Sequence, residues 1–74
     1  MSKEELPLSD DPGARHRESA ERHGQAAARH EDAARFWEEK GDQEHAELER
    51  RNAALERDAA QLERDRAELA ERRA

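Results

Sequence analysis

The stretch WEEKGDQEHAELERRNAALERDAAQLERDRAELAERR, residues 37–73, combines a helix break with a run of seven-residue repeats. A leucine recurring every seven residues is typical of a helix whose apolar stripe packs against another helix. The leucines of this column are Leu48, Leu55, Leu62 and Leu69. If they take the d positions of the heptad, the a positions hold His45, Asn52, Ala59 and Arg66. The repeat therefore predicts one long helix with a leucine seam.

The break is the pair Gly41-Asp42. Glycine suits the left-handed position that follows a helix, and aspartate can cap the helix that comes next. Upstream, Asp11-Pro12 fits an N-cap followed by proline at the first helical position. We therefore predict helices over 12–40 and 43–73, joined by a turn at 41–42. They form one domain, residues 11–74, after a disordered tail at 1–10.

The first predicted helix carries a stripe of its own, in which small residues and histidines alternate. Its members are His16, Ala20, His23, Ala27, His30, Ala34 and Trp37. An antiparallel hairpin would set large residues against small ones, as close packing prefers. It would bring Leu48 level with Ala34, Leu55 with Ala27, Leu62 with Ala20, and Leu69 near Ala14. The layers between them would pair Trp37 with His45, His30 with Asn52, His23 with Ala59, and His16 with Arg66.

The predicted fold is accordingly all-α: an antiparallel helical hairpin with a heptad seam, dimerising into a four-helix bundle, because one hairpin of this composition buries little. A continuous rod is the alternative, since the stretch from Trp37 to Leu48 makes about three helical turns and keeps the stripes aligned. The predicted core and interface residues are Ala20, Ala27, Ala34, Trp37, Leu48, Leu55, Leu62 and Leu69.

The composition of the chain argues against several classes of function. The chain has 74 residues, of which 46% are charged and 32% hydrophobic, and it contains no cysteine. Its net charge of −6 comes from acidic and basic residues mixed along the chain, which disfavours nucleic-acid binding. No apolar run is long enough to cross a membrane, so we expect a cytoplasmic protein. Without cysteine there is neither a disulfide nor a thiolate metal site.

Residues 19–53, SAERHGQAAARHEDAARFWEEKGDQEHAELERRNA, resemble a group of small bacterial proteins built on alanine-histidine repeats. Their pattern is Ser-Ala-Glu-x-His-x-x-Ala-Ala-x-His-x-x-Ala-Ala, then a Gly-Asp break and a second alanine-rich helix. The matching residues are Ser19, Ala20, Glu21, His23, Ala26, Ala27, His30, Ala33, Ala34, Gly41 and Asp42. The group has no established function, so the resemblance implies a helical hairpin and little else. This chain has fewer histidines and a more leucine-rich second helix than the group.

No motif for catalysis is present, because the serines have no base arranged near them and no glycine-rich loop can hold a phosphate. We therefore predict a non-enzymatic module for oligomerisation and protein binding. Its partners are a second copy and, through Phe36 as an anchor, another protein. An acidic helical inhibitor of a basic site on another macromolecule is one alternative.

The histidines offer a second alternative. His16, His23 and His30 are seven residues apart, about 10 Å along a helix, so no two of them on one helix can share an ion. Zinc could bridge histidines of two chains in a metal-binding or storage protein. A pH-sensing role is a further hypothesis: if the rings lie in a partly buried seam, charging them costs desolvation.

Overall fold

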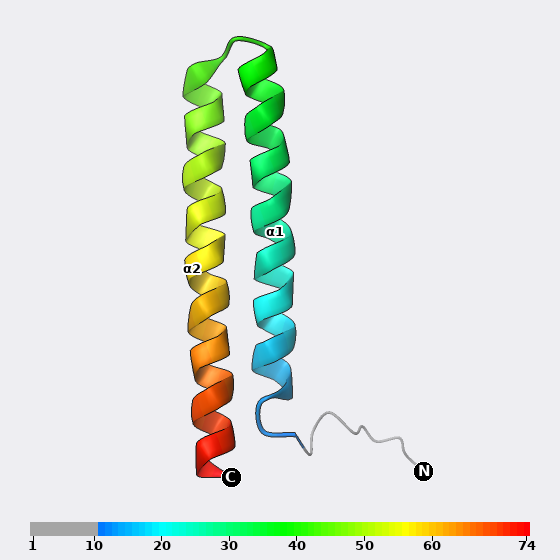
Figure 1. Cartoon of the computed structure of the whole chain (residues 1–74), viewed down its shortest axis with the longest axis vertical. Coiled ribbons are helices and arrows are strands. Elements are labelled where there is room, and N and C mark those ends of the chain that lie inside the picture. Colours follow the sequence, from blue (N-terminus) through cyan, green and yellow to red (C-terminus); the bar gives the residue numbers. More distant parts are fainter. Residues whose placement is uncertain (1–10) are drawn as a thin grey trace, which may run out of the picture.

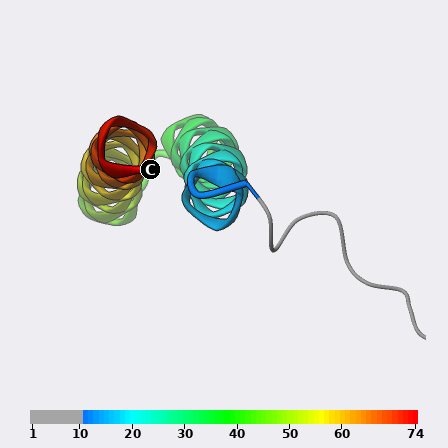
Figure 2. The same ribbon diagram turned by 90° about the horizontal axis from the view of Figure 1, so that it is seen from below.

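A computed structural model describes residues 11–74, so the predicted tail at 1–10 lies outside the described residues. Two helices, α1 (Ala14–Glu39) and α2 (Gln43–Arg73), make up the described part. They run antiparallel and lie side by side, both along their length and in the end-on view (Figures 1 and 2). The predicted all-α hairpin is confirmed, and the continuous rod is wrong.

The turn between the helices is built by hydrogen bonds that stop α1 and start α2. Gly41 has a φ of 81°, and its N–H donates to the carbonyl of Glu38 at 2.9 Å. The N–H of Asp42 donates to the carbonyl of Trp37, also at 2.9 Å, which completes a Schellman motif. The Asp42 carboxylate then accepts from the backbone N–H of His45 at 3.0 Å. The predicted break at this pair is thus confirmed in detail.

The start of α1 differs slightly from the prediction. The helix begins at Ala14 rather than at Pro12. Asp11 instead closes the turn that precedes it: its carboxylate accepts from the N–H of Gly13 at 3.0 Å, and its carbonyl accepts from the N–H of Ala14 at 3.1 Å. Its side chain therefore satisfies a donor just outside the helix, whereas an N-cap would satisfy one within the first turn.

The contact between the helices is made of alanine. Every buried apolar residue of the described part is an alanine, each 7% exposed or less: Ala14, Ala20, Ala27 and Ala34 on α1, and Ala46, Ala53, Ala60 and Ala67 on α2. A Cβ added to Gly13 would lie only 3.2 Å from the carbonyl oxygen of Ala67, so the two backbones nearly touch there. From this point, each step of seven residues forward along α1 corresponds to seven residues backward along α2. Ala20 therefore falls opposite Ala60, Ala27 opposite Ala53, and Ala34 opposite Ala46.

The predicted packing of leucine against alanine within the hairpin is wrong. The leucines are exposed, at 57% for Leu48, 67% for Leu55, 50% for Leu62 and 38% for Leu69. Leu48 comes two residues after the buried Ala46, a rotation of about 200° around the helix, so the leucines lie on the side of α2 turned away from α1. Small residues on both helices let the backbones approach closely, and a leucine between them would hold the helices apart.

Candidate functional site

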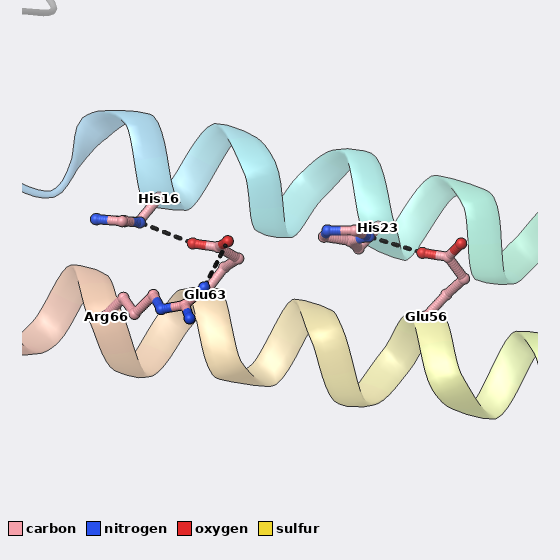
Figure 3. Close-up of polar contacts among 5 residues, drawn as sticks. All are labelled: His16, His23, Glu56, Glu63 and Arg66. Atoms are coloured by element: carbon pink, nitrogen blue, oxygen red, sulfur yellow. Dashed lines mark hydrogen bonds and ion pairs between the residues drawn. The ribbon is translucent and has the colours of Figure 1, made fainter.

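A ladder of histidine-glutamate pairs runs along one edge of the alanine contact. Each histidine of α1 places its Nδ1 atom 2.7 Å from the Oε1 atom of a glutamate on α2. Figure 3 shows two of these pairs reaching across between the helices. Because a carboxylate can only accept, Nδ1 carries the proton in each pair. The pairs are His16 with Glu63, His23 with Glu56, and His30 with Glu49.

The predicted neighbours of these histidines are therefore wrong, for the same reason as the leucine packing. The histidines meet a column of glutamates that lies three residues before the predicted column Asn52, Ala59 and Arg66. The rings lie at the edge of the contact, with side-chain exposures of 31% to 40%, and meet carboxylates. The rings are thus partly buried, as the pH-sensing hypothesis assumed, and each of them meets a carboxylate; the hypothesis itself stays a prediction.

Glu63 is the most enclosed member of the ladder, with a side-chain exposure of 16%. The hydrogen bond from His16 holds the pKa of the Glu63 carboxyl below its usual range. Arg66, whose guanidinium donates to the same carboxylate at 3.1 Å, lowers that pKa further (Figure 3). Glu63 is thus ionised in the folded chain over a wider range of pH than a free glutamate.

A second ladder of ion pairs joins the helices along the opposite edge. It consists of Arg17 with Glu71, Glu31 with Arg57, and Glu38 with Arg50. By the same seven-residue step, Gly24 falls opposite Arg64, so one rung lacks a side chain on α1. A Cβ added to Gly24 would meet nothing within 4 Å. This edge is exposed, and its pairs align the helices more than they stabilise them.

Aromatic residues close the turn end of the hairpin. Trp37 is partly buried and stacks on the His45 ring at a centroid distance of 4.3 Å, so the predicted pairing of these two residues is confirmed. Phe36 meets Trp37 edge to face at 5.2 Å and remains 50% exposed. The Lys40 amine lies 5.3 Å from the centre of the Phe36 ring. The exposed ring is available to a partner, and its role as an anchor stays a prediction.

The leucines form an outer leucine stripe, defined here as Leu48, Leu55, Leu62 and Leu69. The glutamates that follow three of them, Glu49, Glu56 and Glu63, point to α1 through the histidine ladder. On the other side of the stripe runs a charged column: Glu44, Arg51, Asp58, Asp65 and Arg72. A shallow surface depression beside the first leucine is lined by Gln43, Glu44, Glu47, Leu48 and Arg51.

The described residues were compared with the requirements of a metal site and of a membrane-spanning helix. Among residues 11–74, no three histidine or carboxylate side chains converge on a point where they could hold a metal ion. His16, His23 and His30 each face a separate glutamate. Neither helix of the described chain combines the length and the apolar character needed to cross a membrane.

Comparison with protein-family models, with curated proteins and with solved structures finds no match for this chain. The resemblance to alanine-histidine repeat proteins therefore stays a prediction.

Proposed function

We propose that this protein is a non-enzymatic self-association module that binds a second copy of itself through the outer leucine stripe. The observation that carries the proposal is the exposure of four leucines in one line, between 38% and 67%, on a helix whose opposite side is already covered by α1. An aligned row of exposed large apolar side chains is characteristic of an interaction surface, whereas leucines scattered singly would need no explanation.

Energetics support the same proposal. The hairpin core consists of alanines, each of which buries a single methyl group, so the pair of helices is marginal by itself. Complete burial of a leucine side chain contributes about 1.5–3 kcal/mol. Since roughly half of each leucine is exposed, a second copy would contribute about 1 kcal/mol per leucine. Four leucines from each chain would contribute about 8 kcal/mol in total before the cost of association, which is about 4 kcal/mol or more, so the residues that flank the stripe must contribute to the dimer as well.

The two alternatives from the sequence have less support. A zinc ion bridging two chains would use the histidines of α1, and the Nδ1 atom of each of these already meets a glutamate of α2. An acidic inhibitor would present a continuous acidic face. The inter-helix edge carries glutamates paired with arginines, as in Glu31 with Arg57 and Glu38 with Arg50.

The test is sedimentation equilibrium or native mass spectrometry of the full chain across a concentration series. We expect a monomer that converts to a dimer at micromolar concentration. Leu55→Gln combined with Leu62→Gln should abolish the dimer. The matched control is Ala28→Gln, an exposed position on α1 away from the stripe, which should dimerise as the parent does. A parent chain that stays monomeric at hundreds of micromolar would contradict the proposal.

A further inference from the structure

The charged column beside the outer leucine stripe decides how a second copy would dock. The column steps by seven residues along α2: Glu44, Arg51, Asp58, Asp65 and Arg72. Within residues 11–74, the first three of these have no ion-pair partner, Asp65 only accepts from the Gln61 amide, and Arg72 has a distant contact with Glu68 at 3.6 Å. The column is therefore available to charges on another molecule, and it borders the apolar stripe on the side away from the histidine ladder.

We infer that α2 docks antiparallel against α2 of a second copy, in the register that places Arg51 beside the partner's Asp65 and Asp58 beside its own symmetry mate. The inference rests on the proposed self-association and adds its orientation and register. Each α1 then lies on the far side of its own α2, where the alanine contact already holds it.

Charge complementarity selects this register. About a twofold axis at Asp58, Arg51 meets the partner's Asp65 and Glu44 meets the partner's Arg72, and symmetry forms each of these pairs twice. Only Asp58, at the axis, faces a like charge. A shift of one heptad toward the C-terminus would instead set Arg51 against the partner's Arg72 and Asp58 against the partner's Asp65. Every flanking contact would then be repulsive.

The length of α2 points to the same axis. Asp58 is the middle residue of the helix Gln43–Arg73, so an antiparallel pair centred there overlaps along the whole helix. Near the axis, the small side chain of Ala59 leaves room for the partner's Leu55 on an adjacent turn. A shift of one heptad in either direction would leave part of the stripe uncovered. Exposed ion pairs add little affinity individually, but the contrast between attraction and repulsion fixes the register.

Single-cysteine variants of the full chain test the register, because the chain has no cysteine of its own. Asp58→Cys should form a disulfide-linked dimer under mild oxidation. Arg51→Cys mixed with Asp65→Cys should form a mixed dimer, whereas Arg51→Cys alone should not. Glu21→Cys, at an exposed position on α1, is the control for random collision. Preferential linkage of Asp58→Cys to Asp65→Cys would overturn the proposed register.

Charge reversal tests the same contacts without oxidation. Arg51→Asp should weaken dimerisation about tenfold, since two attractive pairs become repulsive, and adding Asp65→Arg should restore it. Asp58→Asn should tighten the dimer a few-fold, whereas the matched change Glu21→Gln should leave it unchanged. A dimer that is insensitive to these changes refutes the register and leaves self-association standing. A parent chain that is monomeric refutes both.

Discussion

The two sides of α2 carry different apolar residues and have different neighbours. One side presents alanine every seven residues and is fully covered by α1, with Ala46 and Ala53 at 0% exposure. The other presents leucine every seven residues and is uncovered, with Leu55 at 67% exposure. The less hydrophobic side forms the contact within the chain. The size of the apolar side chains therefore does not decide which side of α2 meets α1; the side that lets the two backbones approach closely forms the contact.

The two ladders fit only the rotation of α2 that brings the alanines together. When the backbones approach along the alanines, His23 reaches Glu56 on one edge and Glu31 reaches Arg57 on the other. Rotating α2 to bring Leu55 against α1 would separate these partners and widen the gap between the helices. In the observed arrangement, the leucines remain on an exposed surface that a second chain can cover.

The largest expected effect comes from enlarging a buried alanine side chain in the contact between α1 and α2. Ala27→Leu inserts three extra carbon atoms where the side chain is 3% exposed, opposite Ala53 by the seven-residue step along the helices. Overpacking of this kind costs about 1–3 kcal/mol, a large share of the stability of a small hairpin. We expect a clear fall in Tm and helicity by circular dichroism at a concentration at which the chain is monomeric.

The adjacent residue provides the control for that substitution. Ala28 is exposed, so Ala28→Leu should leave the melting curve within about 0.5 kcal/mol of the parent. Equal effects of the two substitutions would show that α1 does not approach α2 through Ala27.

A smaller, stabilising effect is expected at the incomplete rung of the ion-pair ladder. Gly24→Ala should raise stability by about 0.5–1 kcal/mol, because glycine is unfavourable within a helix and the added Cβ has open space. Gly24→Glu should add a few tenths more by pairing with Arg64. Chemical denaturation would measure both, with Gly24→Gln as the uncharged control. A loss of stability in Gly24→Ala would mean that position 24 is packed against a neighbour.

The smallest expected effect is on the stability of the folded chain at acid pH. The pKa of Glu63 is lowered in the folded chain by His16, so its contribution to stability is complete above the unfolded pKa of about 4.3. That contribution is lost as the pH falls through the lower, folded pKa. Melting curves between pH 7 and pH 2 should therefore show a smaller acid-induced decline in Glu63→Gln than in the parent.

Glu18, which is exposed on α1, supplies the comparison for the acid experiment. Glu18→Gln should retain the decline of the parent. If the melting temperatures of both variants decline with acid as much as that of the parent, the contact between His16 and Glu63 does not contribute to stability.

Local signals in the sequence predicted most of the fold. Gly41 and Asp42 marked the turn because the left-handed conformation and the N-cap are properties of single residues. Ala20, Ala27 and Ala34 were correctly placed in the core, since their stripe on α1 has no competitor.

The rule that large side chains pack against small ones could not predict which face of α2 packs against α1. That rule compares side-chain sizes and does not include how closely two backbones can approach. A signal for the observed face was present: the alanine column Ala46, Ala53, Ala60 and Ala67, accompanied three residues later by glutamates that match the histidines of α1 in spacing and charge. Weighing those polar pairs together with the alanines would have favoured the correct rotation.

The most direct test of the central claim, that α1 contacts α2 through alanine and not through leucine, compares two double-cysteine variants. Ala27→Cys with Ala53→Cys should form an intrachain disulfide rapidly in dilute solution, where mass spectrometry identifies the oxidised monomer, because a disulfide requires closely spaced Cα atoms. Ala27→Cys with Leu55→Cys should remain reduced under the same conditions. Rapid closure of the second pair, with the first remaining open, would show that the leucines lie between the helices.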